Sequence, residues 1–172
     1  MEIHRFEKLW IAASLVLIVA FIGTVTYGAV GVPVKMVDDD GGQVDPNNLE
    51  DTQFSRDNLG VHEVGPNEYE VYVLAQRFSF RPGSGEPIRV PAGSTVTFYV
   101  TSSDVIHGFE VAGTNLNTMV IPGQVTEVTV EFDEPGRYGI ICNEYCGAAH
   151  HAMEGRLIVV PRSQYDGEEV DN

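Results

Sequence analysis

Hydrophobic positions follow three different patterns along the chain, and each pattern predicts a different kind of structure. Leu9–Val30 is a run of 22 residues without a formal charge. From Glu68 onward, apolar and polar residues alternate with a period of two, which is typical of half-buried strands. Residues 31–67 between them are rich in Gly, Asp, Asn and Pro. This stretch predicts a solvated connector with a short helix around Leu49–Leu59.

The apolar run is long enough to cross a membrane. As an α-helix rising about 1.5 Å per residue it would reach about 33 Å, against a bilayer core of roughly 30 Å. Trp10 and Tyr27 lie near its ends, where aromatic rings favour the headgroup region. A cleaved signal peptide is the alternative, because small residues follow the run, but its apolar region is usually only about 7–15 residues long. We therefore expect a retained transmembrane helix over residues 9–30.

Charges on the two sides of this helix indicate its orientation. Residues 1–8 contain His4, Arg5 and Lys8, whereas Lys35 and then Asp38, Asp39 and Asp40 follow the span. Positive charge is retained in the cytoplasm during insertion. The pattern predicts a cytoplasmic N-terminus and a single-pass protein of the cell membrane, with its larger part on the extracellular or periplasmic side.

Beyond the connector, short strand-like runs alternate with turn signals such as Pro91–Ser94 and Asp133–Arg137. The runs are residues 68–75, 87–90, 95–101, 125–132, 137–142 and 155–160. Several short strands at this spacing predict a mainly β fold, a Greek-key sandwich or barrel over residues 68–161. Residues 162–172 are acidic and predict a flexible tail.

The net charge of −15 narrows the choice of partners. The charges of positions 1–30 cancel, so residues 31–172 carry 23 acidic and 8 basic side chains. Such a surface repels phosphates, which excludes nucleic acid. Two explanations stay open, steering of a basic redox partner and adaptation to a salty environment. The acidic residues are scattered and only two lysines occur, which favours adaptation to salt.

Both cysteines of the chain lie within twelve residues, together with two histidines and a methionine. The spacing is C-x-E-x-C-x-x-x-H-x-x-M, from Cys142 to Met153. Thiolate and thioether beside imidazole select soft metals, and a weak axial methionine is a habit of electron-transfer copper sites. The run therefore predicts redox copper. It lacks one strong ligand, and His107, which follows the predicted strand 95–101, is the candidate that completes the set.

Together, H-G-F at residues 107–109 and the spaced cluster resemble the dinuclear copper-A domain of subunit II of haem–copper oxidases. The resemblance covers about residues 68–161, and the helix fits the short, single-span members of the family. It implies a cupredoxin-like fold with two copper ions and no catalytic residue in this chain. The expected metal ligands are His107, Cys142, the backbone carbonyl of Glu144, Cys146, His150 and Met153.

Within this resemblance each ligand has its own role. Cys142 and Cys146 bridge both coppers, and His107 and His150 each bind one of them. Met153 and the Glu144 carbonyl are weak axial ligands. The Glu144 side chain is expected to reach an interfacial magnesium, whose other ligands lie in another subunit.

The resemblance also implies a function and partners. The chain would accept electrons from a cytochrome c or a small copper protein and pass them to haem in catalytic subunit I, which reduces oxygen to water. A copper-A subunit of a nitric oxide reductase is an alternative, and so is a membrane-tethered carrier with a single copper. A fourth alternative is a binding module in which the two cysteines form a disulfide.

Other residues near the motif have more ordinary explanations. His151 breaks the ligand spacing and is expected to be a bystander, and His4 and His62 lie outside the predicted domain. Met36 and Met119 are expected to pack in the interior. The family commonly has tryptophans where this chain reads A-Q-R-F-S-F at residues 75–80, so Phe78 and Phe80 would either line the donor-docking surface or fill the core.

Overall fold

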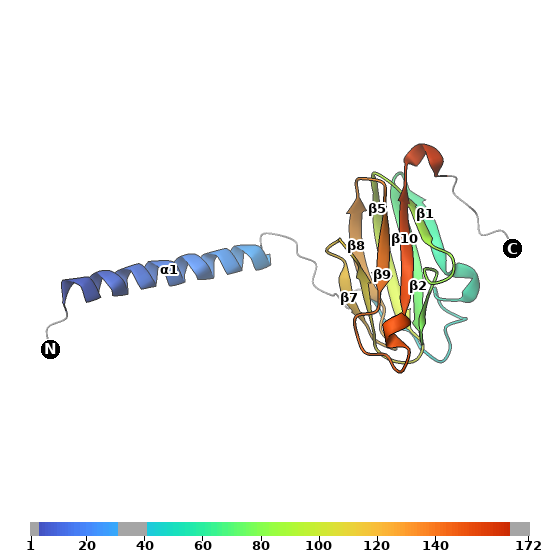
Figure 1. Ribbon diagram of the computed structural model, residues 1–172, viewed down its shortest axis with the longest axis horizontal. Coiled ribbons are helices and arrows are strands. Elements are labelled where there is room, and N and C mark those ends of the chain that lie inside the picture. The colour runs from blue at the N-terminus through green and yellow to red at the C-terminus, as the bar shows by residue number, and fades with distance from the viewer. Residues whose placement is uncertain (1–3, 31–40, 166–172) are drawn as a thin grey trace. The chain divides into compact units, whose positions relative to one another are not determined.

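The computed structural model describes residues 4–30 and 41–165, which form two separate units (Figure 1). One unit contains α1 (Arg5–Val30), and the other is built of strands. α1 is long and apolar enough to cross a membrane, by length and composition. It begins four residues before the predicted span, because Arg5, Phe6, Glu7 and Lys8 continue the helix toward its N-terminus.

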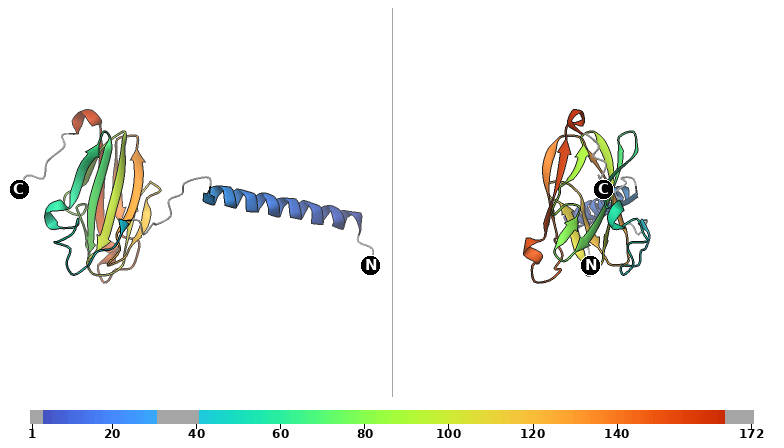
Figure 2. Two further views of the ribbon diagram at one scale, coloured as in Figure 1. Left: turned by 180° about the vertical axis from the view of Figure 1, so that it is seen from behind. Right: turned by 90° about the vertical axis from the view of Figure 1, so that its right-hand side faces the viewer.

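The strands form two five-stranded sheets that pack face to face (Figures 1 and 2). The first sheet has the order β1-β2-β5-β8, with β3 added beside β2. Its strands are β1 (Gly60–Gly65), β2 (Glu68–Gln76), β3 (Ser79–Arg81), β5 (Ser94–Ser102) and β8 (Thr126–Phe132). The predicted mainly β sandwich with one apolar helix is confirmed.

The second sheet has the order β4-β10-β9-β6-β7. Its strands are β4 (Ile88–Pro91), β6 (His107–Val111), β7 (Asn117–Val120), β9 (Gly136–Ile141) and β10 (Glu154–Val160). Each sheet contains one parallel pair, β2 with β5 and β4 with β10, and all its other pairs are antiparallel. Three short 3₁₀ helices complete the described elements: η2 (Arg56–Asn58), η3 (His150–Ala152) and η4 (Arg162–Gln164).

The core lies between the sheets because alternate residues of each strand point inward. In β5, Val96, Phe98 and Val100 are fully buried, with partly exposed residues between them. Phe98 contacts Phe109 from the opposite sheet, with ring centroids 5.8 Å apart. All six predicted strands are present, with ends that differ by one residue or less from the predicted ends.

Four strands were not predicted from the sequence: β1, β3, β6 and β7. They are short, and β1 and β7 show little alternation of apolar and polar residues. Their backbones become strands through pairing with longer neighbours, as β1 does along β2. Local pattern carries no information about such pairing, so only the assembled sheets identify them.

The prediction of a solvated connector is wrong for residues 41–67. Leu49 and Phe54 are buried in a second apolar cluster with Leu74 and Val125, and Phe54 contacts Tyr72 edge-on at 5.9 Å. Single turns span residues 49–58, so the predicted helix shrinks to η2. Residues 31–40 lie outside the described part of the chain.

The predicted flexible tail is also shorter than expected. Tyr165 packs edge-on against the buried Tyr69, with ring centroids 5.5 Å apart. Arg162, in η4, donates a hydrogen bond to the side chain of Asn67. Residues 162–165 therefore belong to the folded unit, and residues 166–172 lie outside the described part of the chain.

Candidate metal centre

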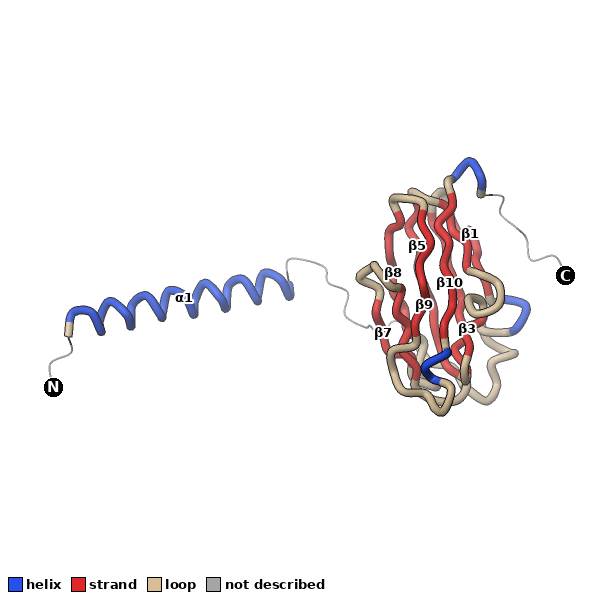
Figure 3. The backbone as a smooth tube through the Cα atoms, viewed as in Figure 1, coloured by secondary structure: helices blue, strands red, loops and turns tan. Residues whose placement is uncertain are grey.

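The loop of residues 142–153, which we call the ligand loop, connects β9 to β10. It lies at the end of the sandwich opposite η4, where loops gather around η3 (Figures 1 and 3). The β9–β10 ladder continues into the loop, because Cys142 N–H donates to the Met153 carbonyl at 3.3 Å. Within it, Met153 N–H donates to the His150 carbonyl at 3.1 Å. Both ends of the loop are therefore held by sheet.

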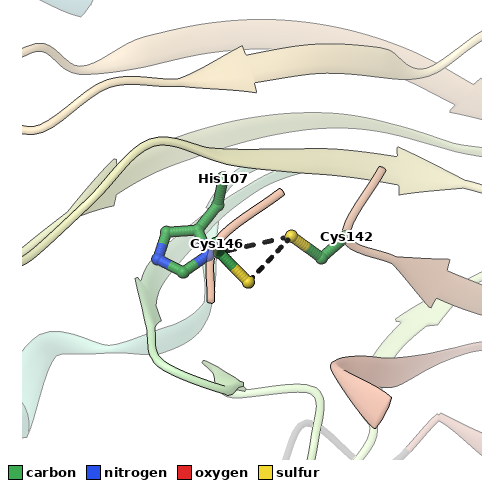
Figure 4. A group of neighbouring side chains, drawn as sticks. All are labelled: His107, Cys142 and Cys146. Atoms are coloured by element: carbon green, nitrogen blue, oxygen red, sulfur yellow. Dashed lines mark hydrogen bonds between the residues drawn. The ribbon is translucent and has the colours of Figure 1, made fainter. Parts of the chain in front are cut away.

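The two thiol groups point toward one another and toward His107 (Figure 4). Cys142 Sγ lies 3.8 Å from Cys146 Sγ and 3.7 Å from Nδ1 of His107. One ligand atom from each residue lies within 4.8 Å of the others, and all three residues are buried. His107 is the first residue of β6, rather than part of a loop, so its position is fixed by the sheet.

The remaining expected donors face the same two sulfur atoms. The Glu144 carbonyl oxygen lies 3.2 Å from Cys142 Sγ. Nδ1 of His150 and Sδ of Met153 each lie 3.6 Å from Cys146 Sγ. Every donor expected from the sequence is therefore within 3.8 Å of a cysteine sulfur.

Asp104 orients the His107 ring, a role that the sequence analysis did not assign. Its Oδ1 lies 2.9 Å from Nε2 of His107. An ionised carboxylate only accepts hydrogen bonds, so Nε2 donates to it, and Nδ1 is the ring nitrogen that faces the sulfurs. The available signal was the aspartate three residues before the histidine in S-S-D-V-I-H.

The surroundings of Asp104 keep this carboxylate ionised. Burial by itself would raise its pKa, but the hydrogen bonds from the His107 ring and from the backbone N–H groups of Arg77 and Val105 lower the pKa below its usual value. Asp104 thus stays an acceptor for His107 near neutral pH.

In the metal-free protein Cys146 holds its proton. Burial, followed by the hydrogen bond and charge of Cys142, raises the pKa of Cys146 to about 11. A thiol must lose its proton to bind a metal, so a metal that binds here displaces that proton.

Gly108 allows the ligand loop to approach β6 closely. A Cβ atom at this position would overlap the Asn143 side chain and lie 2.9 Å from the Asn143 backbone nitrogen. The Asn143 side-chain amide lies against Gly108 and donates hydrogen bonds to Asn117 Oδ1 at 2.8 Å and to Glu110 Oε2 at 3.2 Å. Asn143 thus fastens the loop to β6 and β7.

Other residues singled out in the sequence take ordinary places. His151 is exposed and makes no hydrogen bond with the described residues. Nε2 of His62 lies 2.8 Å from the Asn58 carbonyl. Met119 is 41% exposed, so the expectation that it packs inside is wrong, and Met36 lies outside the described residues. Phe80 is buried against Phe109 and fills the core.

The chemistry of the donor set fits a soft metal and argues against a disulfide. A disulfide needs sulfur atoms about 2.05 Å apart, whereas these are 3.8 Å apart and free. Sulfur atoms this far apart can both reach a common metal, because metal–thiolate bonds are about 2.3 Å long. Buried sulfur, imidazole and thioether donors around a common centre select copper over hard cations.

Comparison with known sequences identifies relatives over most of the chain. The family described as "Cytochrome C oxidase subunit II, periplasmic domain" matches residues 80–161. Cytochrome c oxidase subunit 2 of Thermus thermophilus is 41% identical over 163 residues, covering 91% of this chain and 93% of that protein. The subunit 2 of Alkalihalophilus pseudofirmus is 31% identical over 111 residues, which cover 60% of this chain and 32% of that one.

Comparison with solved structures identifies the same family. One chain of a haem–copper terminal oxidase dimer, determined by electron cryo-microscopy, superposes with a TM-score of 0.68 and 34% identity, covering 91% of this chain and all of that one. The periplasmic domain of subunit II from Bradyrhizobium japonicum, 19% identical with a TM-score of 0.50, covers 55% of this chain and 86% of its own and shares the cupredoxin-like fold. With relatives along nearly its whole length, the chain belongs to the cytochrome c oxidase subunit II family, whose members are parts of a haem–copper oxidase complex.

Proposed function

We propose that this chain is the electron-accepting subunit of a terminal haem–copper oxidase and that it holds a dinuclear copper-A centre. The observation that carries the proposal is the convergence of three side chains and one backbone carbonyl on the two buried cysteine sulfur atoms, which lie 3.8 Å apart. Electrons would come from a cytochrome c or a small copper protein. They would leave to haem in subunit I, where oxygen is reduced to water.

In this proposal the thiolate sulfurs of Cys142 and Cys146 would hold both coppers. His107 and His150 would each supply one imidazole nitrogen, and Met153 and the Glu144 carbonyl would complete the set as weaker ligands. The pairing of contacts supports this set, because His107 and the Glu144 carbonyl face Cys142, whereas His150 and Met153 face Cys146. A copper pair held by these residues would supply one-electron chemistry.

The chain's own residues hold the donors in place and shield the two sulfurs and His107 from water. Cys142 is 4% exposed, Cys146 is 3% exposed and His107 is fully buried. The β9–β10 ladder, the Asp104–His107 hydrogen bond and the Asn143 contacts each fix one part of the donor set. Donors that cannot move give the same geometry before and after electron transfer, which keeps the reorganisation energy small.

The protein surface next to the metal ligands suits docking of an electron-donating protein, because apolar side chains are exposed there. Tyr145 is 78% exposed and its ring lies 5.8 Å from that of His150, and Ile106, next to His107, is 44% exposed. Exposed apolar residues in a patch typically mark an interaction site. We assign this surface to docking of the donor.

The helix α1 is proposed as a retained anchor with its N-terminus in the cytoplasm and the copper domain on the outer side. The basic residues Arg5 and Lys8 at the start of α1 and the aspartates after the helix support this orientation. The match to the solved oxidase chain covers more of this chain than residues 31–172 could supply, so it extends into α1, which supports retention.

A magnesium ion shared with subunit I is part of the proposal. The carbonyl of Glu144 faces Cys142, whereas the residue as a whole is exposed. The carboxylate is thus free to contribute hard oxygen to a cation held between subunits.

Copper analysis with electron spin resonance of the purified full chain tests the function. We expect two coppers per chain and a hyperfine pattern from one electron shared by two equivalent nuclei. Cys142→Ser should abolish that pattern, and His151→Ala should leave it unchanged because the exposed His151 is no ligand. One copper per chain, or the spectrum of a mononuclear site, would refute the dinuclear assignment.

A further inference from the structure

Arg77 lies between β2 and β3 and contacts the ligand loop from outside. Its side-chain Nε donates to the carbonyl of Cys146 at 3.1 Å. Its backbone N–H donates to Oδ2 of Asp104 at 2.9 Å. The proposed ligand set does not include Arg77, although it touches both segments that supply ligands.

These two contacts join parts of the centre that are far apart in sequence. Asp104 holds the ring of His107, and the Cys146 carbonyl belongs to a residue whose sulfur faces His150 and Met153. A substituent on Gly147 would meet the Phe78 ring at 3.2 Å, so the residue after Arg77 packs on the same turn of the loop.

A guanidinium group is positively charged at all relevant pH values. The hydrogen bond from Arg77 Nε to the Cys146 carbonyl places this positive charge beside the backbone of a residue that supplies one of the two thiolates. Adding an electron makes a metal centre more negative, and a fixed positive charge nearby stabilises the reduced form more than the oxidised form. Hydrogen bonds and charges around cysteine ligands are known means of tuning redox potential.

We propose that Arg77 is a positioning residue that raises the reduction potential of the metal centre. This inference rests on the proposed function, because it requires a redox copper centre held by the ligand loop. The reduction adds one electron, supplied by the donor or by an electrode, and Arg77 neither gains nor loses a proton.

The test is voltammetry of the copper-loaded full chain in detergent, with three substitutions at position 77. Arg77→Met removes the charge and the donor, Arg77→Gln keeps a donor without charge, and Arg77→Lys keeps the charge. We expect the equilibrium constant for reduction to fall two- to tenfold in the Met and Gln variants, where tenfold corresponds to about 59 mV. The Lys variant should recover at least half of the difference.

Arg81→Met is the matched control. Arg81 is an exposed arginine at the end of β3, and its side chain makes no hydrogen bond with the described residues. Removing it changes the net charge by the same amount, so it should leave the potential unchanged. Copper content and the electron spin resonance pattern should be the same in all variants, because no ligand has changed.

Several results would overturn the inference. One is a wild-type potential in Arg77→Met, and another is an equal shift in Arg81→Met, which would make the effect one of net charge. A shift in Arg77→Lys as large as that in Arg77→Met would refute the role of charge. Loss of copper in all three Arg77 variants would also overturn the inference, because it would show that Arg77 is needed to hold the ligand loop and not to set the reduction potential. Failure of the wild-type chain to bind copper would instead refute the proposed function.

Discussion

At the scale of single residues, the centre depends on side chains that hold the donors as much as on the donors themselves. Asp104 contacts His107, Arg77 contacts the ligand loop, and Asn143 fastens that loop to β6 and β7, although none of the three belongs to the proposed ligand set. Such neighbours fix the orientation and protonation of metal ligands. Each can be tested by a substitution that leaves all proposed ligands in place.

Replacing Asp104 should weaken copper binding. In Asp104→Ala the His107 ring loses the acceptor for its Nε2 proton, so the ring is free to rotate and to change tautomer. Loss of such a partner typically costs about 10–100-fold in metal affinity. Copper retention during titration with a chelator measures the change. Asp133→Ala, which removes an exposed aspartate elsewhere, should behave as wild type, and equal retention in both variants would contradict the role of Asp104.

Gly108→Ala should strain the contact between β6 and the ligand loop. The added methyl group would displace the Asn143 side chain and break its hydrogen bonds to Asn117 and Glu110. Overpacking of this kind costs about 1–3 kcal/mol of the free energy of unfolding. Chemical denaturation of the metal-free chain measures it.

The matched control for Gly108 is Gly139→Ala in β9, where a new methyl group meets no atom within 4 Å. Asn143→Gly in the Gly108→Ala background should restore part of the lost stability, because two residues in contact have non-additive effects. Full additivity of the two substitutions would show that the proposed clash is not the cause.

At the scale of elements, the second apolar cluster makes residues 41–59 part of the β unit. Its members cover the outer face of the first sheet around Leu74, Tyr72 and Tyr99. Tyr72 and Tyr99 stack with ring centroids 5.1 Å apart, and Phe54 closes over Tyr72. Residues 41–59 therefore contribute to the free energy of unfolding of the β sandwich.

Phe54→Ala tests this conclusion directly. Phe54 is 1% exposed, so truncation should lower the free energy of unfolding by about 3–5 kcal/mol. A solvated connector would tolerate the same change with almost no effect. Denaturant unfolding followed by near-ultraviolet circular dichroism gives the value. Val64→Ala, at a residue 54% exposed in β1, serves as the control with a change below about 0.5 kcal/mol.

At the scale of the whole molecule, copper binding should be coupled to folding of the β unit. The donors come from β6 and from the loop between β9 and β10, so a bound metal links strands that are distant in sequence. A ligand that binds only the folded state adds about 4 kcal/mol of stability at a thousandfold excess over its Kd.

Removing copper with a chelator should therefore lower the Tm of the β unit, and adding copper back should restore it. Differential scanning calorimetry of the full chain in detergent measures both steps. The double variant Cys142→Ser, Cys146→Ser should show the same Tm with and without copper. A chelator effect of wild-type size in that variant would mean that the stabilising metal binds elsewhere.

The net charge of −15 gives a second prediction at this scale. If acidity is an adaptation to salt, raising the salt from 0.1 M to 1 M should raise the Tm, because screening reduces repulsion between carboxylates. If acidity steers a basic donor, the same change should instead slow electron transfer from that donor. Measuring both quantities in one salt series distinguishes the two explanations.

The sequence alone was sufficient for the parts of the protein that local chemistry determines. Alternation predicted the six longer strands, because a half-buried strand must expose and bury successive side chains. Continuous apolarity predicted α1. The spacing from Cys142 to Met153, with His107, predicted the sulfur and imidazole donors, because soft ligands at this spacing are typical of copper sites. The Glu144 carbonyl was expected only from the resemblance to copper-A domains.

Only the tertiary structure decided what depends on contacts between distant segments. Strands β1, β3, β6 and β7 arise from pairing, and the burial of Phe54 arises from a sheet face that no local pattern describes. The same holds at the centre, where Arg77 meets Cys146 across 69 residues and Asn143 crosses Gly108. The metal ligands can be read from the sequence. The neighbouring residues that orient these ligands and set the charge around them are identified only in the folded structure.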